Sequence, residues 1–272
     1  MVLGAARQGL ALARYLALHG AQVVLNDQRH ENEMESAITA LAELQGRTVY
    51  PVRWVLGRHP LEILEAADLL CVSGGVPLTL PIVKHALERG VPVTNDSQIF
   101  LEAAPCPVVG ITGSAGKTTT TTLVGRMAQA AVASALAGGK PRQAWVGGNI
   151  GSPLIAILDE IAPQDLAIME LSSFQLELMT RSPQIAAVLN ITPNHLDRHG
   201  SMAAYTAAKA HILAYQAPVD TAVLGRDDPG AWRAAETARP APGRERASRY
   251  ERVWSGDPDS GVGLGQTSRA IG

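Results

Sequence analysis

Residues 110–122, GITGSAGKTTTTT, join a short apolar run to a turn of small residues and a threonine-rich segment. The run PVVGI at 107–111 predicts a strand, and a helix starting in the threonines would turn backbone N–H groups and its positive end toward an anion. Lys117 would neutralise phosphate oxygens, and Thr118 could place a hydroxyl on Mg²⁺. An ordinary strand-to-helix turn with a threonine cap is the simpler alternative. The adjacent Gly-Lys-Thr favours a phosphate-binding loop.

Apolar runs alternate with helical patterns outward from this loop, which predicts an α/β fold with mostly parallel sheets. Residues 1–27 show a strand, a glycine turn, an Ala/Leu-rich helix and a second strand, the opening of a Rossmann-like unit. Further strands are expected at 68–72, 91–94, 107–111, 165–171, 185–191 and 220–225, and helices at 81–90 and 201–215.

These patterns predict three regions. A Rossmann-like substrate-binding domain is expected over 1–97, and a second α/β domain with the phosphate loop over 98–225. An Arg/Gly/Pro-rich tail over 226–272 lacks a periodic apolar face, and we expect it to be poorly ordered apart from a short helix near 227–236.

The amino-acid composition argues against nucleic acid and membranes as binding partners. The 272 residues are 46% hydrophobic and 18% charged with a net charge of -2, so nothing indicates a surface for nucleic acid. Cys71 and Cys106 lack metal-ligand spacing and are expected to be reduced packing residues. No apolar run approaches the roughly 20 residues that span a bilayer, and no signal-peptide pattern is present. A cytoplasmic monomer without membrane insertion is therefore expected.

The loop departs from the commonest phosphate-loop spacing, because Ile111 stands where G-x-x-x-x-G-K-[ST] has its first glycine. The pattern T-G-x-x-G-K-[ST]-[ST] instead resembles the loop of the Mur ligase and folylpolyglutamate synthase superfamily. Four further segments are similar to Mur ligases: WVGGNIGSPL (145–154), MELSSFQLE (169–177), LNITPNHLDRHGSMAAYTAAKAHI (189–212) and AVLGRDD (222–228). Over about residues 1–233 the chain resembles the Mur ligases that add D-glutamate to UDP-N-acetylmuramoyl-L-alanine.

The resemblance implies an activity and its cofactors. ATP would phosphorylate the carboxylate of UDP-N-acetylmuramoyl-L-alanine, and the amine of D-glutamate would attack the acyl phosphate, with Mg²⁺ at two sites. Family members carry a further C-terminal domain, which we expect this chain to lack. It is therefore expected to be a truncated or frame-disrupted ligase that retains nucleotide binding and lacks competent turnover. A sister Mur ligase, a folylpolyglutamate synthase-like ligase and a non-catalytic nucleotide-binding fragment stay open as alternatives.

The resemblance also implies roles for individual residues of the second domain. Those implied for ATP binding are Gly113, Ser114, Ala115, Gly116, Lys117, Thr118 and Thr119. The implied catalytic residues are Lys117, His195 and Lys209; the implied metal ligands are Thr118, Glu170, His195 and a carbamylated Lys209; and Asn149, Ser172 and His195 are implied to contact substrate.

Taken alone, the same residues have simpler interpretations. Glu170 ends an apolar strand, where a carboxylate is costly unless it meets a cation, although a surface-facing strand end is the alternative. Lys209 in an Ala-rich helix would ordinarily be solvated, His195 would be an ordinary loop histidine, and Asn149 would be a turn residue.

The first glycine turn, GAARQG at 4–9, departs from G-x-G-x-x-G at Ala6. Asp27 ends the second predicted strand, where a dinucleotide enzyme would hold ribose, so NAD binding is only weakly indicated. The resemblance implies instead that the turn binds the UDP moiety. The residues implied are Arg7 and Gln8 near the pyrophosphate, Asp27 and Gln28 near uracil, and Ser73 and Gly74 through backbone contacts.

Overall fold

The structure, a computed structural model, describes residues 1–134, 143–238 and 249–253. It divides into two compact units, each with its own parallel sheet. The first unit consists of Met1–Phe100 with Ser152–Asp159, and the second of Leu101–Gly151 with Glu160–Gly272. The described part of the chain is therefore of the α/β class, as predicted.

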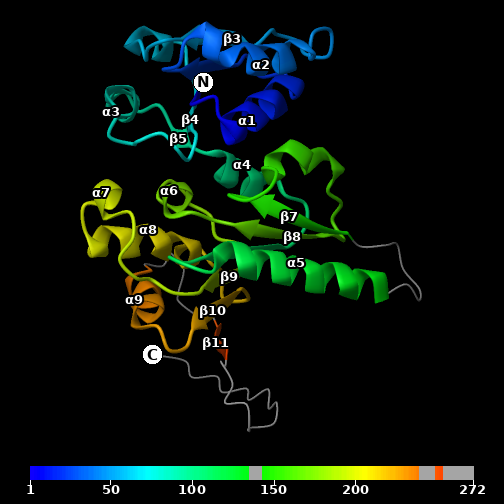
Figure 1. The fold of residues 1–272 in the computed structure, drawn as a ribbon, viewed down its shortest axis with the longest axis vertical. Coiled ribbons are helices and arrows are strands. Elements are labelled where there is room, and N and C mark those ends of the chain that lie inside the picture. The colour runs from blue at the N-terminus through cyan, green and yellow to red at the C-terminus, as the bar shows by residue number, and fades with distance from the viewer. Residues whose placement is uncertain (135–142, 239–248, 254–272) are drawn as a thin grey trace. The chain divides into compact units, whose positions relative to one another are not determined.

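The first unit is built on a five-stranded sheet of order β3-β2-β1-β4-β5, with every pairing parallel (Figure 1). Its strands are β1 (Val2–Leu3), β2 (Val24–Asp27), β3 (Arg53–Leu56), β4 (Leu70–Val72) and β5 (Val93–Thr94). Its helices are α1 (Arg7–Leu18), α2 (Glu31–Ala42), η1 (Leu61–Leu64), α3 (Pro81–Glu88), most of α4 (Asp96–Ala103) and most of η2 (Leu154–Glu160). This strand order puts the first glycine turn at the point where the sheet winds in two directions, which is where open α/β sheets bind ligands.

The first glycine turn requires small residues for a steric reason. A Cβ on Gly9 would collide with the carbonyl oxygen of Gly4, so only glycine lets α1 start this close to the end of β1. Gly4 itself has φ +92°, a left-handed conformation that favours glycine.

The second unit is built on a six-stranded sheet of order β11-β10-β9-β6-β8-β7, again parallel throughout. Its strands are β6 (Val108–Thr112), β7 (Ala144–Gly148), β8 (Leu166–Glu170), β9 (Ile185–Val188), β10 (Thr221–Gly225) and β11 (Arg249–Val253). Its helices are α5 (Lys117–Ser134), α6 (Ser173–Leu176), α7 (Leu196–His199), α8 (Met202–Ala214) and α9 (Pro229–Thr237).

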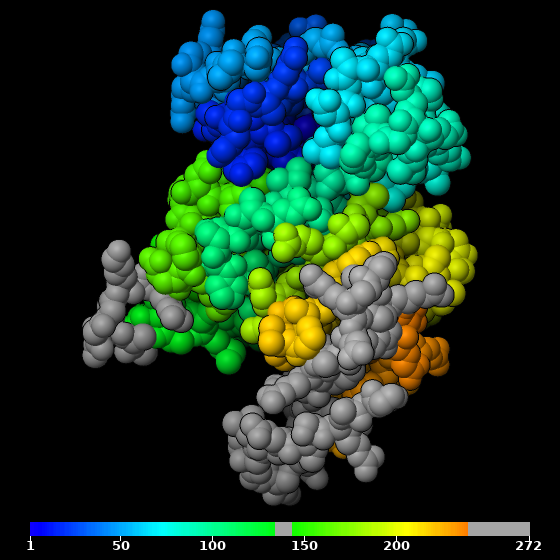
Figure 2. All heavy atoms as spheres, turned by 180° about the vertical axis from the view of Figure 1, so that it is seen from behind, coloured from blue at the N-terminus to red at the C-terminus, as the bar shows by residue number. Residues whose placement is uncertain are grey.

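Helices cover the second sheet. Ile111, Ile168 and Ala187 are buried together, and Val124 and Ala128 of α5 pack against them. Helix α8 contacts β6 and β9, and α9 packs beside α8. In Figure 2 the orange surface of α9 lies next to the yellow surface of the segment that precedes it. Strands β6, β8 and β9 are thus held at the centre, with their carboxyl ends meeting at one edge.

Most predicted elements are present within a few residues, including the short helix α9 in the tail. The sequence analysis did not predict the strands β3, β7 and β11 or the helices α2, α4, α6 and α7. Strand β11 pairs with β10 although its sequence has no apolar run, because the open edge of β10 supplies the backbone partners. Residues 239–248 and 254–272 lie outside the described residues, and the poor order expected there stays a prediction.

Two simpler expectations concern cysteines and membranes. Cys71 and Cys106 are both free and buried, and burial raises the pKa of the Cys71 thiol to about 11. Within the described ranges, every helix is too short or too polar to cross a bilayer.

Candidate functional site

The predicted phosphate loop, residues 113–116, connects β6 to α5. Gly116 has φ +80°, a left-handed conformation that favours glycine and lets the helix begin immediately after it. The first hydrogen bond of the helix start runs from Thr120 N to Gly116 O at 2.9 Å. The N–H groups of Lys117, Thr118 and Thr119 therefore precede the helical ladder and are suited to bind an anion.

The Lys117 side chain folds back onto this loop. Its Nζ donates to Gly113 O at 2.9 Å and to Ser114 O at 3.3 Å. The ammonium group thus contacts the carbonyl oxygens of the loop that the sequence analysis predicted to bind phosphate. A phosphate would exchange these neutral acceptors for a charged one, which makes a stronger hydrogen bond.

Glu170, at the end of β8, lies beside the loop because β8 pairs with β6 so that Ile111 is opposite Glu170. The carboxylate is buried, with 2% of the residue exposed. Thr118 Oγ1 donates to its Oε2 at 2.8 Å, and Asn149 Nδ2 donates to its Oε1 at 2.9 Å. The structure therefore brings three predicted site residues together, and the surface-facing alternative for Glu170 is wrong.

The chemistry of these three residues fits a divalent cation. A carboxylate, a hydroxyl and an amide oxygen are ligands that Mg²⁺ prefers, and two neutral hydrogen bonds do not neutralise a buried carboxylate. No group of three or more His, Cys, Asp or Glu side chains that could hold a metal occurs within the described ranges. The fit to Mg²⁺ thus depends on Glu170 with neutral oxygen donors around it.

Lys209 is also part of this cluster. Only 1% of the residue is exposed, and its Nζ donates to Thr112 Oγ1 at 3.2 Å and to Gly113 O at 3.0 Å. Burial, and to a smaller extent the nearby Lys117 charge, lower the pKa of this ammonium to about 7 against the opposing effect of Glu170. The ordinary expectation of a solvated helix lysine is therefore wrong here.

His195 packs beside Phe174. It is exposed, precedes α7, and has φ 52° and ψ 32°, a left-handed conformation that is strained for a residue other than glycine. Its ring centroid lies 5.2 Å from that of Phe174. Across the described residues, no hydrogen bond joins His195 to Glu170 or Lys209, so its metal-binding role stays a prediction.

Ser172 has a structural partner in this structure. Its N–H and Oγ donate to Gln175 Oε1 at 2.9 and 3.0 Å, and its Oγ accepts from Gln175 N at 3.3 Å. This is a capping box at the start of α6. A substrate contact by Ser172 stays a prediction.

Two residues of the site were missed by the sequence analysis. Asn190 bonds the backbone of Ala115, and the Tyr205 hydroxyl lies 3.0 Å from Ser114 Oγ. The Tyr205 ring also lies 4.9 Å from the Lys209 ammonium. The spacing of Tyr205 and Lys209, one helical turn apart, was the available signal, because residues at i and i+4 share a helix face.

In the first unit, Asp27 is engaged by the glycine turn. Its Oδ2 accepts from Ala5 N at 2.7 Å, and Arg29 donates from Nε to Oδ1 at 3.0 Å and from a terminal nitrogen to Oδ2 at 2.8 Å. Although burial opposes the shift, these hydrogen bonds lower the pKa of Asp27 to about 2. Asp27 thus braces the turn, and Arg29 is a partner that the sequence analysis did not name.

The other predicted residues of the first unit either lie near the glycine turn or are exposed. Ser73 follows β4, and its N–H donates to Leu3 O at 2.9 Å next to the turn. Gln8 Nε2, at the start of α1, is buried and has no hydrogen-bond partner within the described part of the chain. Arg7 and Gln28 are exposed, and Gly74 is half-buried. An unpartnered buried donor beside a helix start fits an anionic ligand.

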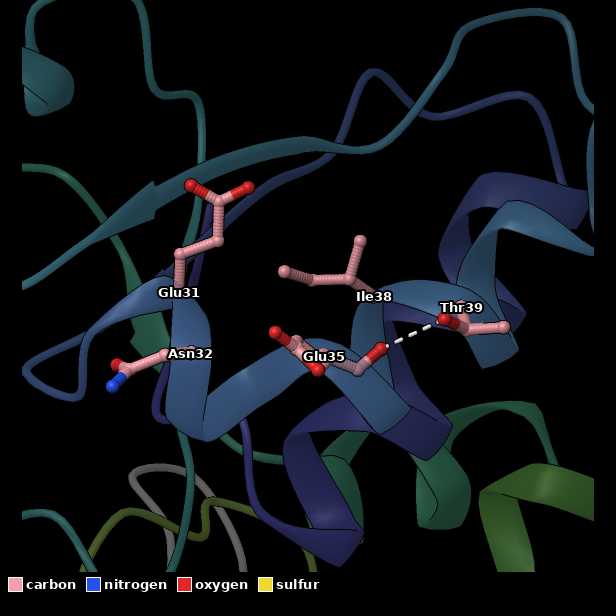
Figure 3. Close-up of a pocket in the computed structure, with 5 residues that line it drawn as sticks. All are labelled: Glu31, Asn32, Glu35, Ile38 and Thr39. Atoms are coloured by element: carbon pink, nitrogen blue, oxygen red, sulfur yellow. Dashed lines mark hydrogen bonds between the residues drawn. The ribbon is translucent and has the colours of Figure 1, made fainter.

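A shallow pocket lies elsewhere in the first unit, on α2. Figure 3 shows its lining residues, Glu31, Asn32, Glu35, Ile38 and Thr39, with the Thr39 hydroxyl donating to the Glu35 carbonyl. None of the predicted site residues lines it. Its two glutamates make it a poor site for a phosphorylated ligand.

Models of known protein families match both sheets. Residues 1–95 match the model of the Mur ligase MurD-like, N-terminal domain, and residues 111–246 match that of the Mur ligase middle domain. The chain belongs to the Mur ligase family. The phosphate loop, Glu170 and Lys209 all lie within the middle-domain match.

Among curated Mur ligases, the chain is similar to those named UDP-N-acetylmuramoylalanine--D-glutamate ligase. It is 44% identical over 230 residues to that of Pelotomaculum thermopropionicum, covering 84% of this chain and 47% of the relative. It is 41% identical over 239 residues to that of Trichlorobacter lovleyi, covering 88% and 50%. The chain spans about half the length of the curated relatives it matches.

Solved Mur ligase structures support the fold alone. The ligase described as UDP-N-acetylmuramate:L-alanyl-gamma-D-glutamyl-meso-diaminopimelate ligase from Neisseria meningitides matches with TM-score 0.53 and 15% identity, covering 92% of this chain and 76% of that one. The murein peptide ligase of Psychrobacter arcticus matches with TM-score 0.50 and 15% identity, covering 92% and 52%.

Proposed function

We propose that this chain forms the UDP-substrate and ATP sites of a ligase that joins D-glutamate to UDP-N-acetylmuramoyl-L-alanine. The observation that carries the proposal is the convergence of Lys117, Thr118, Asn149, Glu170 and Lys209 at one edge of the second sheet. Phosphate would bind the first turn of α5 and Lys117. The similarity to relatives of that name supports D-glutamate as the amino acid added.

The residues suit phosphoryl transfer. The γ-phosphoryl group of ATP would pass to the substrate carboxylate, releasing ADP, and the amine of D-glutamate would then displace phosphate to form the amide. Lys117 would neutralise charge on the transferring group, while the α5 start orients the phosphates. Bound Mg²⁺ would supply further positive charge; Thr118 and Glu170 would hold one ion, and His195 and modified Lys209 would hold a second.

Lys209 is suited to carbamylation, which would make it such a ligand. With a pKa of about 7, a large fraction of its amine is uncharged at neutral pH. The neutral nitrogen would attack carbon dioxide, form an N–C bond and lose a proton, giving an anionic carbamate. Carbon-13-labelled bicarbonate would show it as a carbamate resonance in the wild-type chain that is missing in Lys209→Met.

Two measurements test the proposed function. Calorimetry should show ATP binding that strengthens with Mg²⁺, with the Mg²⁺ effect lost in Glu170→Gln. An assay of ADP release should show a rate that depends on both UDP-N-acetylmuramoyl-L-alanine and D-glutamate. Absence of ATP binding by the wild-type chain would contradict the nucleotide site, and ADP release that requires a different amino acid would favour a sister ligase. Binding of ATP and of UDP-N-acetylmuramoyl-L-alanine without amide formation would identify a non-catalytic nucleotide-binding module.

A further inference from the structure

The phosphate loop is held by a neighbouring loop, residues 189–192, that follows β9. Ser114 N donates to Asn190 O at 2.9 Å. Ser114 Oγ donates to Thr192 O and accepts from Thr192 N, each at 2.9 Å. These bonds fix the two loops against each other through the backbone of the neighbouring loop.

The side chain of Asn190 adds a different kind of contact. Its Oδ1 accepts from Ala115 N at 2.9 Å, and its Nδ2 donates to Ala115 O at 3.1 Å. A single carboxamide thus satisfies the donor and the acceptor of one backbone residue, as a strand partner would. Ala115 is exposed and has no polar side chain, so this pair, the Asn190 clamp, is its principal restraint.

The clamp lies in a loop that lacks the usual first glycine. Ile111 occupies that position, is buried in β6 and cannot take part in the turn. The turn is therefore confined to residues 113–116, where Gly113 and Gly116 are the glycines. The clamp occupies the N–H of Ala115 and leaves the N–H groups from Gly116 onward for an anion.

The neighbouring loop is itself fixed from its other side. Ile191 N donates to Asp228 Oδ1 at 3.0 Å, and the same oxygen accepts from Ala231 N at the start of α9. The loop thus lies between the phosphate loop and a capped helix. Asn190 is presented by a rigid support, as a preorganised site requires.

We propose that Asn190 is a positioning residue, which holds Ala115 so that the phosphate loop has its binding shape before a nucleotide arrives. The proposal rests on the proposed function insofar as the ligand of the loop is a polyphosphate. Asn190 itself need not touch the ligand.

The test compares Asn190→Ala with Thr192→Val, a matched control in the same loop. Inorganic tripolyphosphate and ATP, each with Mg²⁺, are titrated into the full chain by calorimetry. Loss of these two solvent-exposed hydrogen bonds should weaken binding of both ligands about tenfold in Asn190→Ala. Thr192→Val should bind as the wild type does, because Thr192 contacts Ser114 only through its backbone.

Asn190→Asp separates the two halves of the clamp. Its carboxylate keeps the acceptor for Ala115 N but faces Ala115 O without a donor, so binding should weaken more than in Asn190→Ala. A purely structural role would instead lower the urea midpoint of Asn190→Ala and leave the affinity of its folded form unchanged. That result would overturn the proposal.

Amide hydrogen exchange tests the clamp without any ligand. The Ala115 N–H should exchange about tenfold faster in Asn190→Ala than in the wild type, and equal rates would overturn the proposal. If the wild-type chain binds neither ATP nor tripolyphosphate while Ala115 exchange responds as expected, the proposed nucleotide site fails and the clamp is supported.

Discussion

Replacing Lys209 by Met should stabilise the second unit below neutral pH. The native pKa of about 7, against 10.5 for an unperturbed lysine, corresponds to a cost of about 5 kcal/mol for keeping the buried ammonium charged. The variant loses two hydrogen bonds, worth about 1 kcal/mol each. Neither partner is left without a hydrogen bond, because Gly113 O still accepts from Lys117 and the Thr112 hydroxyl still donates to Leu171 O. The expected net gain is about 3 kcal/mol.

The sign of the pH dependence follows from the lowered pKa. The unfolded chain holds the Lys209 proton up to the unperturbed value, whereas the folded chain releases it above about pH 7, so the cost is fully present below pH 7 and declines as the pH rises toward 10.5. Between about pH 6 and about pH 9, wild-type stability should rise relative to Lys209→Met by about 3 kcal/mol.

Urea unfolding in buffer depleted of carbon dioxide measures this difference. Trp145 and Trp232 lie in the second unit and report on it by fluorescence. Lys84→Met, which replaces an exposed lysine, is the matched control and should leave the pH profile unchanged. Parallel pH profiles for wild type and Lys209→Met would refute the reasoning, because a lysine without a lowered pKa adds no pH dependence in this range.

Two other substitutions test the steric and ionic arguments. Asp27→Asn should lower the free energy of unfolding by about 1 kcal/mol at neutral pH, because the partly exposed Arg29 makes only a modest ion pair. In the wild type this ion-pair contribution is lost as the pH falls toward about 2, so the acid-unfolding curves of the two proteins should converge there. Gly225→Ala would place a Cβ against Leu189 O and should lower the free energy of unfolding by about 2 kcal/mol or more. The urea midpoint should fall accordingly, and an unchanged midpoint would show that the backbone moves aside without an energetic cost.

The sequence predicted the alternation of strands and helices well, because strand-turn-helix transitions are marked by apolar runs and glycines. The meeting of Thr118 with Glu170 could not be derived from spacing, since 52 residues separate them and only the pairing of β6 with β8 brings them together. The resemblance supplied both residues but not their hydrogen bond.

Lys209 shows a second limit. Helix α8 is apolar around most of its circumference, so its sequence does not reveal which face is buried, and local spacing favoured solvent for the lysine. Asn190 was missed for a different reason: its role depends on the backbone of Ala115, which carries no side-chain signal. Contacts to backbone groups are invisible to motif analysis.

The carbonyl oxygen of Gly113 accepts from both Lys117 and Lys209, so two ammonium groups compete for one acceptor. If Lys209 becomes a carbamate as proposed, one of these donors disappears and a repulsive neighbour of Lys117 becomes an attractive one. The carbon dioxide content of the buffer would then act as a variable in every measurement on the loop. Affinities for phosphate from degassed and bicarbonate-containing solutions would describe two chemically different forms of the same chain.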